Sequence, residues 1–335
     1  MSGRIRAITA AVAAAALLAG CGGGGGATDS APQKLKHFDV ELDGFPGPET
    51  VAIPMAAREG YFKDAGLSVE INIPGGPLAP IPYLFNDFAD LSVTHQPQVV
   101  LAREKGVPIT AFGSLVPQPT AAMIWLKKSG IKDVADLKGK TIATEKLAFQ
   151  RDFLKTVLAR GGLTLDDVKV INGEYYLVPA LVNGRVDAIF GGSANVEGAD
   201  LEARGMDPVV TPVEDFDVPS YDELVMVAQS DRLASEGDEI RAFMSAVVRG
   251  AEAAIEDPEG AAEAIRKAGS IHPFFKFNRQ RTEAELEATL PLLSTSGEMS
   301  TEQAEGLIDW MHEEGLLQRE LPASAVLTND YLLGA

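Results

Sequence analysis

The 335-residue chain has a formal net charge of −19, with 48 acidic against 29 basic side chains. Phosphate binding relies on clustered lysine and arginine, so this balance argues against nucleic acid as a partner. A single cysteine excludes an internal disulfide and a cysteine metal cluster, and the length fits two lobes of ordinary domain size.

The first segment, residues 1–20, has the pattern of a cleaved secretory signal. Arg4 and Arg6 give a basic start, and the alanine-rich apolar run at 7–18 is too short to span a bilayer stably. We therefore exclude residues 1–20 from the fold. The remaining body has 335 − 20 = 315 residues and a formal charge of −21, because two arginines and no acid are removed.

The signal ends in a more specific motif. Leu18-Ala19-Gly20-Cys21 resembles the bacterial lipobox, which implies cleavage before Cys21 and lipidation of that residue. The alternative is a plain secretory signal with an accidental cysteine, and the placement of the chain's only cysteine argues against it. Residues 21–34 are glycine-rich and predict a flexible tether. Lipid and tether together predict a body anchored to the cell membrane on its extracytoplasmic face.

The body begins with alternating strands and helices. The apolar spacing predicts strands at 37–42, 67–73, 91–93 and 109–114, with helices at 51–58, 77–85 and 98–105. This alternation favours an α/β fold with a parallel sheet.

A second β/α unit follows and is inserted in the first. We expect strands at 123–126, 141–143, 168–170 and 186–190, helices at 149–160 and 177–182, a returning strand at 224–228, and helices from 239 onward at 240–256, 258–268, 282–293 and 301–314. Two crossings, near 121–126 and 224–228, would connect the units, as in a two-lobed clamp with a hinge. Residues 35–122 and 224–335 would form lobe 1, and 123–223 lobe 2.

One stretch of the inserted unit delivers polar side chains to the end of a strand. After the strand at 186–190, Gly191-Gly192 loosens a loop that carries Asn195 and Glu197. In open α/β sheets ligands collect at the carboxyl ends of strands. An amide and a carboxylate two residues apart can recognise a ring edge with donors and acceptors. The alternative is an ordinary polar turn, in which Glu197 caps a helix starting near Gly198.

Several motifs resemble one protein family. They include residues 42–62, LDGFPGPETVAIPMAAREGYF, then Gln96-Pro97-Gln98-Val99, Asn195-Val196-Glu197-Gly198 and VPSYDELV at 218–225. The resemblance is to solute-binding proteins of ABC importers related to the thiamine-pyrimidine synthase, and to the wider nitrate, sulfonate and taurine binders. The last two motifs resemble the branch that binds pyrimidine precursors of thiamine or riboflavin-like rings.

The resemblance implies a periplasmic-binding-protein-like clamp that closes on a small flat heterocycle and delivers it to a permease with its ATPase. No cofactor or metal is implied. Glu197 is the leading ligand contact, because a carboxylate accepts charge-assisted hydrogen bonds from an aminopyrimidine edge. The candidate ligand-binding residues lie at loop ends and crossings: Asp43, Phe45, His95, Gln96, Gln118, Phe149, Tyr175, Tyr176, Asn195, Glu197 and Tyr221.

The pocket differs from the family pattern. Gly44 stands where relatives have tryptophan, Ser193-Ala194 replaces an aromatic pair, and His95-Gln96 replaces a common Tyr-Glu. The cleft has therefore lost rings and gained a histidine, and the ligand need not be copied from relatives. On spacing alone, Phe45 and Phe149 fit a core role, and adjacent Tyr175 and Tyr176 would place at most one ring in the cleft.

Binding is favoured over catalysis. The resemblance aligns Thr50 with the histidine of the synthase, and the cysteine-rich iron motif of that enzyme is absent from the sequence. The chain also has no Gly-x-Ser-x-Gly elbow, no His-Glu-x-x-His motif and no phosphate-binding glycine loop before a helix. The open alternatives are a binder of riboflavin or of a sulfonate- or nitrate-type anion, a synthase-like enzyme, and a binder that feeds a sensor instead of a permease.

Overall fold

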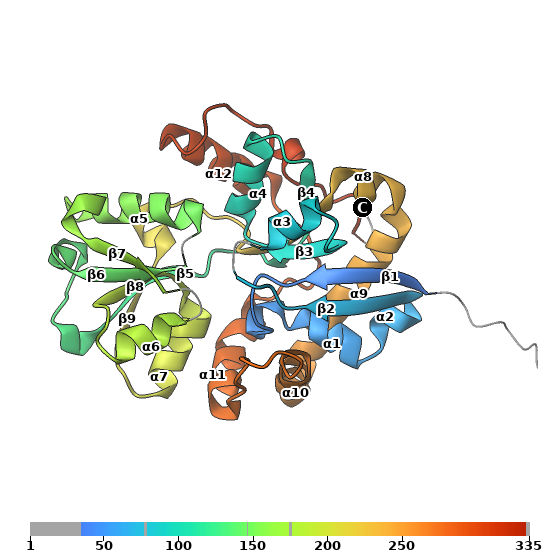
Figure 1. The fold of residues 1–335 in the computed structure, drawn as a ribbon, viewed down its shortest axis with the longest axis horizontal. Coiled ribbons are helices and arrows are strands. Elements are labelled where there is room, and N and C mark those ends of the chain that lie inside the picture. Colours follow the sequence, from blue (N-terminus) through green and yellow to red (C-terminus); the bar gives the residue numbers. More distant parts are fainter. Residues whose placement is uncertain (1–34, 77–78, 146, 174–175, 333–335) are drawn as a thin grey trace, which may run out of the picture. The chain divides into compact units, whose positions relative to one another are not determined.

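The computed structural model describes residues 35–76, 79–145, 147–173 and 176–332, which belong to one compact unit (Figure 1). The expected signal and tether, with the lipidation site Cys21, lie outside the described residues, as does Tyr175. Among the described helices, none combines the length and the apolar character needed to cross a bilayer.

The first sheet gathers strands from both ends of the described chain. It contains β1 (Lys36–Glu41), β2 (Leu67–Asn72), β3 (Leu91–Thr94), β4 (Ile109–Val116) and β10 (Leu224–Gln229), in the order β2-β1-β3-β10-β4. Strand β1 runs parallel to β2 and β3, whereas β10 runs antiparallel to β3 and β4. The expectation of a parallel sheet is wrong at β10, because that strand enters from the second sheet and its direction is set by the chain path.

The second sheet has the same mixed character. Its strands are β5 (Ala121–Leu126), β6 (Thr141–Thr144), β7 (Lys169–Asn172), β8 (Ala188–Ser193) and β9 (Pro208–Pro212), in the order β7-β6-β8-β5-β9. Strand β6 is parallel to β7 and β8, and β5 is antiparallel to β8 and β9. The sequence did not predict β9, an edge strand that begins and ends with proline, as edge strands tolerate.

Helices cover both sheets. Around the first sheet these are α1 (Ala52–Arg58), α2 (Tyr61–Asp64), α3 (Pro80–Phe85), α4 (Gln96–Glu104), α8 (Ser230–Ser235), α9 (Gly237–Glu256), α10 (Pro258–Gly269), α11 (Arg279–Thr289) and α12 (Thr301–Glu313). On the second sheet, α5 (Ala148–Arg160) lies over one face, and α6 (Leu177–Val182) and α7 (Ala199–Ala203) lie over the other (Figure 1).

This arrangement confirms the predicted α/β class. The chain passes between the two sheets twice, once from β4 to β5 and once from β9 to β10. The exact lobe boundaries at 122/123 and 223/224 remain a prediction. Two short helical turns supply residues to the site described next: η1 (Pro48–Thr50) and the π-helical turn η6 (Ala194–Gly198).

Candidate functional site

A cavity of about 430 Å³ is lined by elements that belong to both sheets. The side of the first sheet contributes the loop after β1, turn η1 and helix α11. The side of the second sheet contributes the ends of β6 and β8 and turn η6. Carboxyl groups dominate its ionisable lining. They are Asp43, Glu49, Glu145, Glu197, Asp200 and Glu285.

Each arginine in the lining lies in an ion pair with a carboxylate that also lines the cavity. Arg204 pairs with Asp200 at 2.7 Å, and the Nε atom of Arg281 lies 3.3 Å from Glu285. Lys276 is exposed and its Nζ atom donates to the carbonyl of Pro273 at 3.4 Å. The cavity therefore offers mainly carboxyl acceptors to a ligand.

His95 occupies the carboxyl end of β3 and forms the site's best-defined ion pair. Its Nδ1 atom lies 2.8 Å from Oε1 of Glu223, which is only 3% exposed. Burial alone would lower the pKa of His95, but the hydrogen bond and charge of Glu223 raise it to about 9. Burial acts to raise the pKa of Glu223, and the contact with His95 outweighs it, so that pKa is lowered. The pair is therefore charged at neutral pH.

Glu49 was missed by the sequence reasoning. Its Oε1 atom accepts hydrogen bonds from Thr120 Oγ1 at 2.9 Å and from Asn195 Nδ2 at 3.1 Å. Burial, and then the nearby charge of Glu223, raise the pKa of Glu49 to about 7. Glu49 lies in turn η1 and not directly after a strand. The search for polar residues at strand ends therefore could not select it.

Glu145 was also missed, although it directly follows β6. Gln150 brackets it: the Nε2 atom donates to the Glu145 carboxylate at 3.1 Å, and the Oε1 atom accepts from the Glu145 backbone N–H at 3.0 Å. Burial, and then the proximity of Glu197, raise its pKa to about 8. The strand-end reasoning that selected Asn195 and Glu197 applies equally to this residue.

Glu197, the leading sequence candidate, lines the cavity from turn η6. Its Oε2 atom accepts a hydrogen bond from the Ser193 backbone N–H at 2.7 Å, at the end of β8. The alternative prediction, that Glu197 caps the helix after Gly198, is wrong, because α7 has no side-chain cap. Burial raises the pKa of Glu197. The residue is thus held in place by the turn, and its ligand role stays a prediction.

Asn195 does not line the cavity. Its Nδ2 atom donates to Glu49 at 3.1 Å and to Thr289 Oγ1 at 2.8 Å, so the amide joins turn η6 to η1 and α11. In this structure Asn195 therefore connects elements around the cavity.

The remaining candidates divide into two groups. Asp43, Phe45 and Tyr176 line the cavity with His95 and Glu197. Phe45 packs against the His272 ring at a centroid distance of 5.2 Å, and burial raises the pKa of Asp43.

The second group stands behind or outside the lining. Gln96 is buried and donates to Asp222 at 3.0 Å, Phe149 packs in the core beside His95, and Tyr221 donates to Glu223 at 3.2 Å. Gln118 is exposed. None of these four lines the cavity, and within the described ranges the one group with metal-ligand geometry also lies outside its lining.

Some relatives of this chain are named for thiamine biosynthesis or for binding a pyrimidine, and others are named as a synthase. A profile described as NMT1/THI5 like matches residues 48–261. A Haemophilus influenzae protein named for thiamine biosynthesis is 30% identical over 84% of this chain and 88% of its own. A formylaminopyrimidine-binding protein of Halalkalibacterium halodurans is 30% identical over 70% and 71%. A 4-amino-5-hydroxymethyl-2-methylpyrimidine phosphate synthase of Schizosaccharomyces pombe is 27% identical over 63% of each chain.

The fold is similar to that of solved binding proteins. The alkanesulfonate-binding protein SsuA from Xanthomonas axonopodis pv. citri superimposes with a TM-score of 0.68 at 18% identity, covering 88% of this chain and 99% of that one. This likeness confirms the predicted periplasmic-binding-protein-like fold.

Proposed function

Because this chain belongs to the NMT1/THI5-like family, we propose that it is the substrate-binding protein of an ABC importer and captures an aminopyrimidine precursor of thiamine. The family predicted from the sequence is thereby confirmed. The relative named as a formylaminopyrimidine-binding protein supports this ligand class, and the proposed partners are a permease and its ATPase.

The observation that carries the proposal is the carboxyl-rich cavity. An aminopyrimidine presents an exocyclic amino group and, when protonated, a ring N–H, both of which donate hydrogen bonds. Asp43, Glu145 and Glu197 line the cavity and can accept them. A sulfonate or nitrate is disfavoured by the excess of carboxyl groups, because each arginine in the lining, Arg204 and Arg281, lies in an ion pair with a lining carboxylate. The lining therefore supports a neutral or cationic heterocycle over an anion.

We favour binding over catalysis for this chain. The family resemblance of the sequence places Thr50 where the synthase has its histidine. The Thr50 hydroxyl donates to the Gly47 carbonyl at 3.3 Å and accepts from the Gly47 N–H at 3.2 Å. The residue thus closes a backbone turn. The relative named for binding supports the same view, while the fungal relatives carry the name of an enzyme.

The proposed place of action is the extracytoplasmic face of the membrane, with the lipid on Cys21 as anchor and residues 21–34 as tether. The lipobox-like sequence before Cys21 supports this. Replacing Cys21→Ser should release the protein from the membrane fraction and change its processing, as followed by fractionation and mass spectrometry. A membrane-bound, identically processed variant would contradict the anchor.

The ligand proposal is tested by calorimetry with formylaminopyrimidine, riboflavin and taurine on the wild type and on Glu197→Gln. We expect formylaminopyrimidine to bind tightest and the substitution to weaken it by about 1.5–3 kcal/mol, the contribution of a hydrogen bond to a charged group. A glutamine can still accept from the Ser193 N–H, so the turn should persist.

The matched control is Glu202→Gln, an exposed glutamate on neighbouring α7 that does not line the cavity. It should leave the affinity unchanged. Tight binding of taurine alone would overturn the ligand class, and equal affinities of wild type and Glu197→Gln would remove Glu197 from the site.

A further inference from the structure

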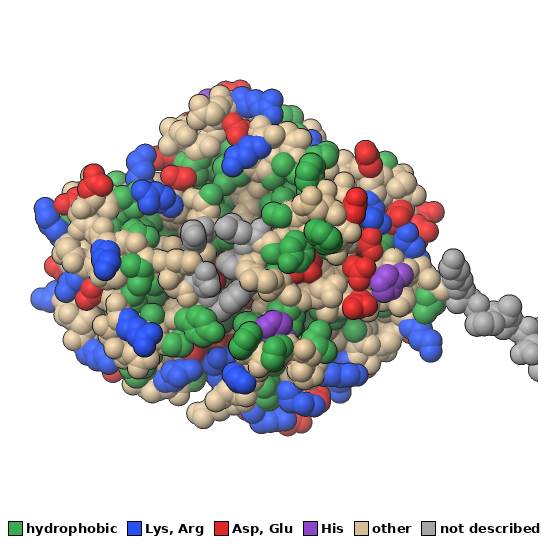
Figure 2. Space-filling view, viewed as in Figure 1, with side chains coloured by type: hydrophobic (Ala, Val, Ile, Leu, Met, Phe, Trp, Pro, Cys, Tyr) green, Lys and Arg blue, Asp and Glu red, His purple; other side chains and the backbone are tan. Residues whose placement is uncertain are grey.

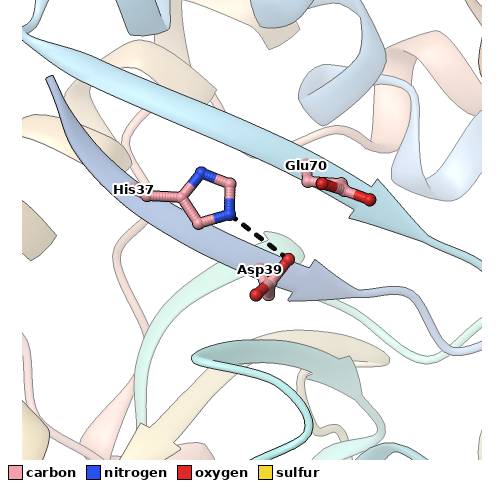
Figure 3. A group of neighbouring side chains, drawn as sticks. All are labelled: His37, Asp39 and Glu70. Carbon is pink, nitrogen blue, oxygen red and sulfur yellow. Dashed lines mark ion pairs between the residues drawn. The ribbon is translucent and has the colours of Figure 1, made fainter.

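Three potential metal ligands lie together on the first sheet, among residues that do not line the cavity. His37 and Asp39 are two positions apart on β1, so their side chains project from the same face of the sheet (Figure 3). Glu70 is the direct register partner of Asp39 on β2. The parallel pairing of two strands therefore places an imidazole and two carboxylates side by side.

The separation of these groups matches a single coordination sphere. One ligand atom from each residue lies within 4.8 Å of the others. The Nε2 atom of His37 is 3.4 Å from Oδ1 of Asp39. Nitrogen and oxygen ligands about 2.0–2.2 Å from a tetrahedral zinc ion are separated by roughly 3.4 Å. The His37–Asp39 spacing already has this value, and a carboxylate oxygen of Glu70 lies within 4.8 Å of both partners.

The surroundings hold two of the three ligands in place. The Asp39 backbone N–H donates to Asp90 Oδ2 at 2.8 Å, and the Asp90 N–H donates to the Asp39 carbonyl at 2.8 Å, which fixes β1 at this point. The Nδ1 atom of His37 lies 3.5 Å from the Ser68 hydroxyl on β2, leaving Nε2 directed at Asp39. An outer contact to one ring nitrogen that orients the other is typical of metal-binding histidines.

The site is also accessible and negatively charged. The His37 and Asp39 side chains are 51% and 40% exposed, so an ion can enter from solvent. In Figure 2, carboxyl side chains gather beside a histidine over the β1 and β2 strands. The neighbouring cation, Lys36, is paired with Glu236 at 2.7 Å.

We propose that His37, Asp39 and Glu70 form a surface site for a divalent transition-metal ion of the Zn²⁺ class, with water completing the coordination. The imidazole selects this class, because Mg²⁺ and Ca²⁺ prefer ligand sets made of oxygen alone. The ion would join β1 to the edge strand β2 and stabilise the folded protein, since it binds the assembled strands and not the unfolded chain.

The test is calorimetric titration of the metal-free full-length protein with ZnCl₂, with thermal unfolding as a second readout. We expect one site whose affinity falls at least tenfold in His37→Ala and in Glu70→Gln, and a rise in Tm with Zn²⁺ that both variants lose. MgCl₂ at the same concentrations should give neither effect.

His312→Ala is the matched control, because His312 lies on α12 and is not part of the group. It should bind Zn²⁺ as the wild type does. The proposal is overturned if Zn²⁺ does not bind, or if His37→Ala and Glu70→Gln bind it as tightly as the control. Both exposed substitutions are checked for folding by circular dichroism.

Discussion

At the scale of single residues, Glu223 joins both passages of the chain between the sheets. Its Oε2 atom accepts from the backbone N–H groups of Thr120 and Ala121 at 2.8 and 3.1 Å, and from the Tyr221 hydroxyl at 3.2 Å. Its Oε1 atom holds His95 at 2.8 Å. A buried carboxylate with this many donors is stabilised in its charged form. Glu223 therefore holds the two passages of the chain together and also orients the His95 side chain in the cavity.

Replacing Glu223→Gln should therefore lower the free energy of unfolding by about 3 kcal/mol, because His95 loses its buried counter-charge and an amide NH₂ competes with the backbone donors. Urea denaturation at pH 7 measures this. The exposed Glu214→Gln, from the same crossing, should change stability by less than about 0.5 kcal/mol. Equal stability of the two variants would show that the Glu223 contacts contribute little.

The sequence reached part of the site because some of its residues follow strands. Asp43, His95 and Glu197 come after predicted strands and line the cavity. Glu145 obeys the same rule and was overlooked. Glu49 and Glu285 could not be found this way, since Glu49 lies in turn η1 and Glu285 on helix α11. The approach of both elements to the cavity depends on tertiary packing.

At the scale of elements, the contact between α1 and α9 depends on a missing side chain. A Cβ atom at Gly250 of α9 would lie 2.1 Å from the Ala52 carbonyl oxygen and 2.9 Å from the Ala56 nitrogen, both backbone atoms of α1. Backbone atoms cannot rotate away as a side chain does. The glycine therefore sets the close approach of the two helices.

Replacing Gly250→Ala should destabilise the protein by about 1–3 kcal/mol or more, because overpacking outweighs the gain of about 1 kcal/mol in helix propensity. The control is Gly306→Ala, an exposed position of α12 where nothing lies within 4 Å of the added Cβ. This substitution should stabilise the protein by about 0.5–1 kcal/mol. Chemical denaturation compares them. Stabilisation by both substitutions would refute the packing argument.

Element positions were more predictable than element directions. The helix expected at 177–182 is α6, and the strand expected at 224–228 lies within β10. Apolar spacing is local and marks such segments. The antiparallel entry of β10 and the pairing of β5 with β9 depend on partners far apart in sequence, and turn η6 appeared only as a loop.

At the scale of the whole molecule, the cavity concentrates groups that hold protons more tightly than the unfolded chain does. The pKa values are raised to about 7 for Glu49, about 8 for Glu145, about 8 for Glu285 and about 9 for His95. For the three carboxyl groups burial is the largest cause. For His95 burial acts the other way and the Glu223 contact prevails. All four shifts have the same sign.

The stability of the ligand-free protein should therefore fall as the pH rises from 5 to 9. A raised folded-state pKa contributes stability that is complete below the unfolded value, here 4.5 for the glutamates and 6.5 for His95, and is lost as the pH passes the folded value. The lowered pKa of Glu223 acts below pH 4.5, outside this window. We expect a loss on the order of 1 kcal/mol per group, measured by urea denaturation at pH 5.5, 7 and 8.5.

Two comparisons locate the source of this pH dependence. Glu145→Gln removes one of the groups whose pKa is raised. The stability of this variant should therefore fall less between pH 6 and 8.5 than that of the wild type.

A ligand that donates N–H groups to the cavity carboxylates would stabilise their charged forms, so saturating formylaminopyrimidine should flatten the wild-type profile over the same range. A profile that is flat or rising without ligand would mean that these carboxyl groups are hydrated in the free protein, and that the cavity opens to solvent before a ligand enters.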